Sequence, residues 1–313
     1  MRRIALIAAV TALVLASLGP LDGTAQAAFP GGDGDIAYGT LFPLSRVYTI
    51  GSDGSNRTMV TPADWAASSP AWSADGSTIA FVRNRPDGSS SALMTMDPNG
   101  SGLSTVVPFA TGRTIDSPTW SPDGNSLAFC AFRRHGPAIF TVHANGTALT
   151  NITLGTHDDC DPAWSPDGNT IALDTHLPAT RASRIVTINP DGTGRTVVVN
   201  LGFNYYPDWS PDGTHLTFAR FVPDPGAGFG TYDIFTVKTD GTQLRNLTRS
   251  PSRSEWTPAY SPSGTSIVYA REQGATTSLP DDLWIIASNG VGRPTRLTDT
   301  PRYDEFNPSW QPT

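Results

Sequence analysis

One phrase recurs along the chain: proline, any residue, an aromatic residue, and then a Ser-Pro-Asp-Gly turn or a close variant. Its copies lie at residues 70–76, 118–124, 162–168, 207–213 and 258–264, with a truncated copy at 308–312. The aromatic residues of successive copies are 44 to 51 positions apart, and only Tyr260 is not tryptophan. A fixed period of this length predicts a repeat architecture in which every copy contributes one supersecondary unit.

Each copy is followed by the same succession of short β-rich segments. A strand such as Ile79–Phe81 comes soon after the Asp-Gly turn, and a second such as Leu93–Met96 follows a loop of variable length. An Asn-Gly or Asp-Gly pair then marks a tight hairpin, because these residues accept the positive φ angles that such turns require. With a last short strand after it, the unit holds four strands in about 45 residues, which is typical of one blade of a β-propeller.

The two ends of the chain complete one blade between them. The first unit begins at its second strand, near Ile36, and the last unit supplies only the missing first strand, around Trp310. Pairing these segments would close the ring and remove exposed sheet edges. We therefore predict an all-β fold, a six-bladed β-propeller of four-stranded antiparallel blades, with residues 28–313 as one domain.

Residues 1–27 have the pattern of a signal peptide. Arg2 and Arg3 precede an apolar run from Ile4 to Leu18, and residues 25–27 offer a small-residue cleavage site. The run is short for a bilayer span, and no second apolar stretch follows it. We therefore expect a secreted protein, periplasmic or extracellular, with no stable membrane insertion after the signal is removed.

Charge argues against one class of partner. The formal net charge is −7, and removing residues 1–27, which carry two Arg and one Asp (a net +1), would make it −8. An acidic surface without clusters of Lys and Arg repels phosphate backbones. No nucleic-acid partner is therefore expected.

The repeat resembles that of the TolB family, whose propeller is built on the phrase P-x-W-S-P-D-G-x-x-I-A-F. The resemblance covers about residues 33–311, all six predicted blades. It implies a non-catalytic propeller that binds a protein partner in the cell envelope, as TolB binds a peptidoglycan-associated lipoprotein and a colicin. TolB carries an additional α/β domain before its propeller, whereas here about six residues separate the predicted cleavage site from the first blade.

Comparison of the repeats with one another distinguishes two faces of the ring. The Asp-Gly and Asn-Gly turns have constant spacing and define a tight-turn face, whereas the loops between second and third strands hold 8 to 15 residues. Those loops define a variable face, together with the segments that lead into each inner strand. Variable loops on a rigid frame are where binding usually resides, so we place the partner- or ligand-binding site there. Its candidate residues are Trp65, Asp116, His135, His157, Asp158, Asp159, Asp161, Asp174, His176, Tyr205, Glu255, Trp256, Asp304 and Glu305.

The two cysteines of the chain, Cys130 and Cys160, are expected on the variable face of neighbouring blades. In an exported protein we predict that they form a disulfide. Side chains near this pair that could bind a divalent ion are His135, His157, His176 and Asp174. Because no local ligand motif such as H-E-x-x-H accompanies them, neither a metal nor a cofactor is expected.

Two classes of function remain. The chain contains neither a G-x-S-x-G nucleophile turn nor a phosphate-binding glycine motif, so no catalytic residue is predicted. Aromatic side chains with charged neighbours suit a protein partner, because large flat groups bury area at low entropic cost. The alternative is a secreted hydrolase or lyase acting on a glycan or lactone at the acidic mouth of the ring, or a propeller that binds carbohydrate through Trp65, Tyr205 and Trp256.

Overall fold

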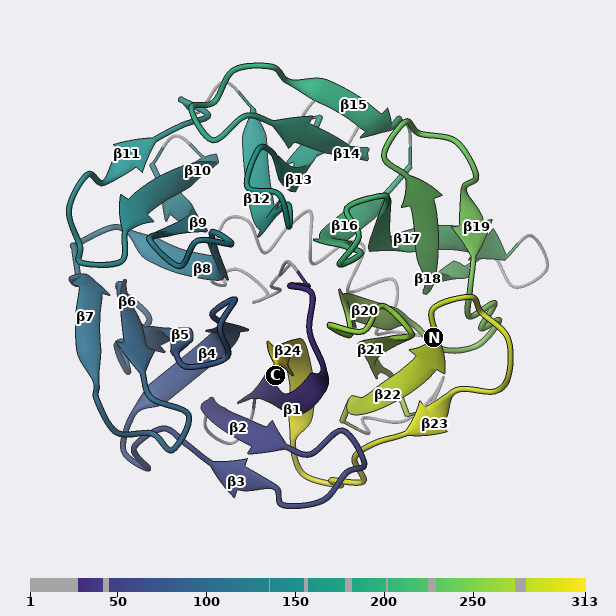
Figure 1. Ribbon diagram of the computed structural model, residues 1–313, viewed down its shortest axis with the longest axis horizontal. Helices are drawn as coiled ribbons and strands as arrows, with labels where there is room; N and C mark the ends of the chain where they lie inside the picture. Colours follow the sequence, from purple (N-terminus) through teal and green to yellow (C-terminus); the bar gives the residue numbers. More distant parts are fainter. Residues whose placement is uncertain are drawn as a thin grey trace.

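The computed structural model describes residues 28–41, 45–134, 136–154, 157–177, 182–200, 202–224, 229–273 and 280–313. Within these ranges lie 24 β-strands, arranged as six four-stranded antiparallel sheets around a central axis (Figure 1). The all-β, six-bladed propeller predicted from the repeat is confirmed. The predicted signal peptide, residues 1–27, lies outside the described residues.

The blades are numbered in chain order, and their strands are given from the axis outwards. Blade 1 contains β24 (Asp304–Pro312), β1 (Asp33–Leu41), β2 (Arg46–Ile50) and β3 (Thr58–Met59). Blades 2 and 3 contain β4 (Ala66–Trp72), β5 (Ile79–Asn84), β6 (Ser91–Met96) and β7 (Ser104–Val107), then β8 (Thr114–Trp120), β9 (Ser126–Arg133), β10 (Gly136–His143) and β11 (Thr150–Asn151). Blades 4 and 5 contain β12 (Asp158–Trp164), β13 (Ile171–His176), β14 (Ser183–Ile188) and β15 (Thr196–Val199), then β16 (Asn204–Trp209), β17 (His215–Asp224), β18 (Phe229–Lys238) and β19 (Arg245–Asn246). Blade 6 contains β20 (Glu255–Tyr260), β21 (Ser266–Arg271), β22 (Asp282–Ala287) and β23 (Thr295–Arg296).

Blade 1 is assembled from both ends of the chain. β24 lies antiparallel to β1, with Ile36 opposite Trp310 and Ala37 opposite Ser309. In Figure 1 the yellow C-terminal strand lies beside the purple β1 close to the axis. The predicted closure of the ring by the C-terminal strand is confirmed.

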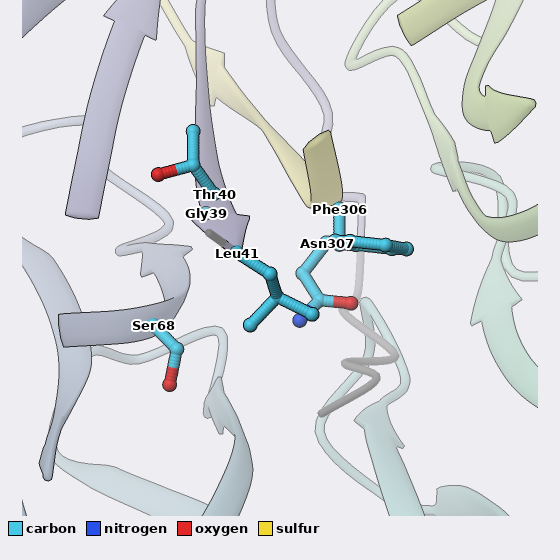
Figure 2. A pocket seen from close by; sticks show the side chains of 6 residues that line it. All are labelled: Gly39, Thr40, Leu41, Ser68, Phe306 and Asn307. Atoms are coloured by element: carbon cyan, nitrogen blue, oxygen red, sulfur yellow. The ribbon is translucent and has the colours of Figure 1, made fainter. Parts of the chain in front are cut away.

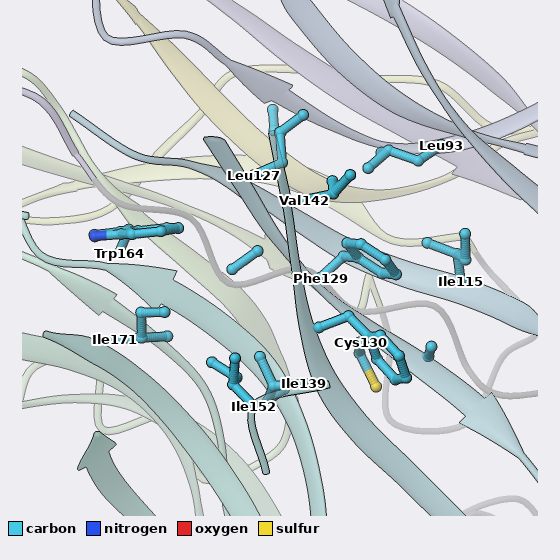
Figure 3. Close-up of a cluster of buried hydrophobic side chains, with 14 of the residues drawn as sticks. Leu93, Ile115, Leu127, Phe129, Cys130, Ile139, Val142, Ile152, Trp164 and Ile171 are labelled. Carbon is cyan, nitrogen blue, oxygen red and sulfur yellow. The ribbon is translucent and has the colours of Figure 1, made fainter. Parts of the chain in front are cut away.

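The blades stack face to face, so their strands are apolar on both sides. In β9 the five residues from Leu127 to Ala131 are all fully buried. They belong to a core cluster that also contains Leu93 of blade 2 and Ile171 of blade 4 (Figure 3). Continuous apolar runs, rather than strict alternation, are therefore what this fold requires of its middle strands.

One hairpin is longer than the repeat suggests. The sequence predicts a loop around residues 223–230, but β17 continues to Asp224 and β18 begins at Phe229, with Val222 opposite Thr231. The extension is stabilised by pairing of the two strands beyond the core of blade 5. It projects blade 5 further on the variable face than a simple loop would.

Every inner strand carries the same backbone irregularity. The residue before the repeat's proline has a φ angle between +47° and +57°, and the register with the second strand shifts at this point. These six residues are Ser69, Ser117, Asp161, Tyr206, Thr257 and Asn307. The left-handed conformation costs about 1–2 kcal/mol for a residue with a Cβ, so its recurrence means that packing around the axis enforces it.

Contacts between neighbouring blades alternate around the ring. After the repeat's proline stand, in blade order, Ser309, Ala71, Thr119, Ala163, Asp208 and Ala259. Each side-chain oxygen of this series accepts a hydrogen bond from the backbone N–H of the next blade's aromatic residue: Ser309 from Trp72 (3.0 Å), Thr119 from Trp164 (3.4 Å) and Asp208 from Tyr260 (2.7 Å). After two of the alanines the next indole reaches back instead: Trp120 Nε1 donates to the Ala71 carbonyl (3.1 Å) and Trp209 Nε1 to the Ala163 carbonyl (3.0 Å). The six similar blades are therefore joined by two kinds of seam.

Closure through β24 predicts a large effect of Trp310→Ala. The side chain is 93% buried between blades, with 7% of its surface exposed, and truncating a buried Trp costs about 3–5 kcal/mol. We expect urea unfolding to show a loss of this size. Val291→Ala is the control, since Val291 is 69% exposed; equal losses from the two variants would contradict the closure role.

Candidate functional site

Strand directions bring the predicted candidate residues to one face of the ring. Asp158, at the start of β12, pairs with His176, at the end of β13, so an inner strand begins where the second strand ends. The candidates lie on β8 (Asp116), β12 (Asp158, Asp159, Asp161), β13 (Asp174, His176), β16 (Tyr205), β20 (Glu255, Trp256) and β24 (Asp304, Glu305), with Trp65 and His157 just before β4 and β12. His135 lies outside the described residues.

Three of these acids are fully buried and have an arginine of their own. Arg195 Nη2 lies 2.5 Å from Asp159 Oδ1, Arg271 Nε lies 3.4 Å from Glu255 Oε1, and Arg57 Nη2 lies 3.7 Å from Glu305 Oε1. Burying a charge is costly unless it is paired, which explains why each acid has its guanidinium. Because these carboxylates would have to be unburied to meet a partner, we leave Asp159, Glu255 and Glu305 out of the candidate binding surface.

A second group of acids, Asp116, Asp161 and Asp174, is buried in blades 3 and 4 near the axis. Ser117 Oγ donates to Asp161 Oδ1 (2.6 Å), and His176 Nε2 lies 3.3 Å from Asp174 Oδ2. Burial raises the pKa of Asp161 well above its usual range, and the neighbouring charge of Asp174 raises it further. Burial works to lower the pKa of His176, but hydrogen bonding and attraction to Asp174 leave it raised overall. The Asp161 carboxyl therefore holds its proton more tightly than an exposed aspartate does.

Hydrogen bonds continue from this acid group around the axis. Ser69 Oγ donates to Asp116 Oδ1 (2.6 Å), Asn307 Nδ2 donates to Ser69 Oγ (3.5 Å), and Asn307 N donates to Thr257 Oγ1 (3.3 Å). Three of the partners are residues with left-handed backbone, so these bonds help to hold the inner-strand bulges. The mouth of the ring on this side is consequently occupied by side chains that bind one another.

The same mouth contains one small hollow. It has a volume of about 10 Å³, close to the minimum for a single water. Figure 2 shows it at the seam of blades 1 and 2, between the ends of β1, β4 and β24, lined by Gly39, Thr40, Leu41, Ser68, Phe306 and Asn307. A space of this size has no room for a sugar ring.

On blades 5 and 6 the variable face carries a run of touching rings, here called the aromatic cluster: Phe203, Tyr205, Tyr206, Phe221, Tyr232 and Trp256. The centroids of Tyr232 and Trp256 are 3.9 Å apart, and those of Tyr205 and Tyr232 are 5.9 Å apart. Phe203, at the outer end, is 37% exposed, and the other rings are half-buried. His176 joins the cluster to the acid group, because its ring lies 5.3 Å from that of Tyr205.

Of this cluster, the sequence candidates include Tyr205 and Trp256 but not the other four rings, Phe203, Tyr206, Phe221 and Tyr232. Phe221 and Tyr232 are direct partners across the β17–β18 hairpin. Aromatic residues at matching distances from the centre of a hairpin were the available signal. It was obscured because this stretch was interpreted as a loop.

A disulfide joins Cys130 of β9 to Cys160 of β12, with Cα atoms 5.1 Å apart. In the sheets Cys130 lies opposite Asp116, and Cys160 lies opposite Asp174. Figure 3 shows Cys130 among apolar side chains of blade 3. The covalent link between blades 3 and 4 thus lies directly beside the buried acid group and fixes its two halves relative to each other.

In the residues that the structure describes, no group of three or more His, Cys, Asp or Glu side chains is arranged to hold a metal ion. Of the four residues named as ligands from the sequence, His176 and Asp174 contact each other, His157 is exposed, and His135 is outside the described ranges. The described ranges also contain no helix long and apolar enough to cross a membrane.

Comparison with known proteins identifies the family. The model of the TolB beta propeller domain matches residues 44–313, and the chain belongs to this family. TolB from Acinetobacter baumannii superposes with a TM-score of 0.72 at 21% identity, over 90% of this chain and 68% of that one. A putative TolB from Agrobacterium tumefaciens superposes with 0.68 at 20% identity, over 90% and 100% of the two chains. Hydrazine synthase from Kuenenia stuttgartiensis gives 0.71 at 14% identity, over 90% and 47%. At these identities the similarity to solved structures establishes the fold alone.

The disulfide predicts a measurable stability difference. Cys130 and Cys160 are separated by 30 residues, and closing a loop of that length restricts the unfolded chain by about 3 kcal/mol. The double variant Cys130→Ser with Cys160→Ser should lose about this free energy of unfolding in urea. Adding a reductant should lower the stability of the natural chain to that of the variant; a natural chain insensitive to reductant would contradict the prediction.

Two buried acids predict how stability depends on pH. Burial raises the pKa of Glu255 and of Glu305 to about 7, from an ordinary value of 4.5, against the opposing effect of nearby hydroxyl groups and arginines. The folded state therefore binds these protons more tightly than the unfolded state. Their contribution is fully present below pH 4.5 and is lost as the pH rises through about 7.

Glu305→Gln should accordingly flatten the fall in unfolding free energy between pH 5 and pH 8, as should Glu255→Gln. The change in slope is at most about 1.4 kcal/mol per pH unit for each variant. Urea unfolding at a series of pH values measures it. Asp64→Asn, at an exposed position, should leave the slope unchanged, and an equal slope in all three variants would rule out the assignment.

Proposed function

We propose that this chain is an exported, non-catalytic β-propeller that binds a protein partner through the variable face of blades 4 to 6. The observation that carries the proposal is the aromatic cluster, six rings in mutual contact on a face otherwise rich in buried acids. Aromatic side chains that are already packed lose little freedom on binding and dominate the energetics of protein interfaces. We take residues 28–313 to be the mature domain and residues 1–27 to be its signal peptide.

The acid group adds a preference for charge. Asp161 and Asp174 lie behind Tyr205 and Tyr206 and raise the pKa of both phenols, although burial of the rings is the larger cause. Negative potential at the aromatic cluster favours a partner that presents Lys or Arg beside apolar groups. The partner that this surface fits is therefore a folded protein with a mixed apolar and basic patch, in the envelope or outside the cell.

The rigidity of the surface supports the same interpretation. The disulfide joins blades 3 and 4 beside the acid group, and Tyr206 is held by the inner-strand bulge. A site built on strands and cross-linked to the neighbouring blade loses little conformational entropy on binding. TolB, to whose family the chain belongs, offers the analogy of a propeller that acts by protein contact, and fold-level analogy is all that it supplies.

We do not favour a glycan- or lactone-cleaving activity at the mouth of the ring. The acids there are buried, Asp116 and Asp161 accept hydrogen bonds from Ser69 and Ser117, and the neighbouring hollow is about 10 Å³. Catalysis by paired carboxylates needs space for a substrate between them.

The proposal is tested with Phe203→Glu and Tyr205→Ala, compared with Leu149→Glu. Leu149 is 43% exposed, close to the 37% of Phe203, but it follows the Asn145-Gly146 turn on the tight-turn face. A photoreactive phenylalanine analogue placed at position 203 or 149 crosslinks the partner in an envelope fraction from the source cells. We expect one discrete crosslinked protein at position 203 and none at 149.

Binding of that protein is then measured by surface plasmon resonance. The Phe203 and Tyr205 variants should weaken it at least about tenfold, as expected for interface hot spots, whereas Leu149→Glu should not. Crosslinking at position 149 in preference to 203, or equal affinities for all variants, would refute the proposal.

A further inference from the structure

The fifth copy of the repeat differs from the others at its aromatic residue. At the two other seams where the backbone N–H of this residue donates to a side-chain oxygen, between blades 1 and 2 and between blades 3 and 4, the residue is Trp72 or Trp164. Blade 6 has Tyr260 in this place, at the seam with blade 5. A phenol ring is smaller than an indole, so this seam has less side-chain volume than the repeat would provide.

A cavity lies at that seam on the tight-turn face. Its volume is about 410 Å³, within the range of about 300–1,000 Å³ that small-molecule sites have. Its walls come from the turns of blade 5 and blade 6, and Tyr260 is part of the lining. The turns of the two blades approach each other closely at Gly264, where an added Cβ would lie 3.1 Å from Pro211 Cγ. The cavity is thus built by the fold and is on the opposite side of the ring from the aromatic cluster.

The lining is polar, unlike that of most pockets of this size. Ten of its twelve residues have polar side chains, the exceptions being Pro211 and Gly264. Part of the lining forms the frame: Ser210 Oγ donates to Asp212 Oδ1 (2.6 Å), and Ser288 Oγ donates to the Gly264 carbonyl (2.7 Å). Such walls favour a ligand that can form hydrogen bonds.

Other lining groups can form further hydrogen bonds. Within the described residues, the side chains of Gln243, Arg245 and Tyr260 make no hydrogen bond or ion pair. Tyr260 is 95% buried, with 5% of its surface exposed, and its backbone is fixed by the bond from its N–H to Asp208 Oδ2 (2.7 Å). The Tyr260 hydroxyl opens into the cavity beside the exposed side chains of Gln243 and Arg245, so all three can form hydrogen bonds to a ligand.

We propose that this cavity is a binding site for a neutral saccharide of one or two sugar units. The formal charges of its lining, Asp212 and Arg245, cancel, so the site has no net attraction for an anion or a cation. Amide, guanidinium, phenol and carboxylate groups together offer both donors and acceptors, the combination that sugar hydroxyl groups need. The site is independent of the proposed partner-binding surface, because it lies on the other face and shares no residue with it.

The test is calorimetric titration of the full chain with three neutral disaccharides, maltose, cellobiose and N,N′-diacetylchitobiose. We expect at least one to bind with a single site. Tyr260→Trp, which restores the residue of the other copies and fills the cavity, should weaken that binding at least tenfold. Arg245→Gln should also weaken it, whereas Arg293→Gln, at an exposed position of the same face, should not.

Failure of all three sugars to bind overturns the proposal, as does binding that Tyr260→Trp leaves unchanged. Tighter binding of glucuronate than of every neutral sugar would overturn the neutral class. Thermal unfolding of Tyr260→Trp checks that it is folded, and Arg245→Gln provides the same information without altering the core. Because Phe203→Glu should abolish partner capture while leaving sugar binding intact, failure of either proposal is recognised separately from failure of the other.

Discussion

The ring depends on the bond that each inner strand makes to the next blade. Sheets stacked only by apolar faces could slide, but a hydrogen bond from the aromatic N–H to Ser309, Thr119 or Asp208 fixes three of the seams in register. At two of the intervening seams the indole bonds to a backbone carbonyl instead. The two kinds of seam follow the alternation of alanine with an oxygen-bearing residue after the repeat's proline. Where the aromatic residue is Tyr260, the seam keeps its backbone bond to Asp208, and the cavity of blades 5 and 6 lies beside it.

The two faces of the ring owe their difference to what each turn must do. On one face, Asp-Gly and Asn-Gly pairs only reverse the chain. On the other, the strands begin and end among charged and aromatic residues, and the inner-strand bulge brings Asp161 and Tyr206 into the same neighbourhood. Internal arginines neutralise Asp159, Glu255 and Glu305. The aromatic cluster lies beside these ion pairs, next to the buried carboxyl groups of Asp161 and Asp174.

Most of the fold could be predicted from the sequence because its signals are local. An Asp-Gly pair specifies its own turn. The first unit begins at its second strand, near Ile36, and the missing first strand is found near Trp310, which implies both the blade count and the closure. The site was less predictable because its contacts are not local. Arg195 reaches Asp159 across 36 residues. Neither spacing nor composition shows that the two form an ion pair, or that neither is then available to bind a partner. The same holds for Tyr232, whose position beside Trp256 depends on how the β17–β18 hairpin of blade 5 packs against blade 6.

The proline and the left-handed residue before it have a consequence for the inner edges of the six blades, which face the axis. The six inner strands present their open edges there, and an open edge normally invites another strand to join. Here each edge is broken at the same level: proline has no N–H to offer, and the bulge shifts the groups beside it. An extended peptide laid along such an edge would find no unbroken row of main-chain donors and acceptors with which to pair. The inner strands therefore resist the strand addition that would otherwise make them a template for aggregation.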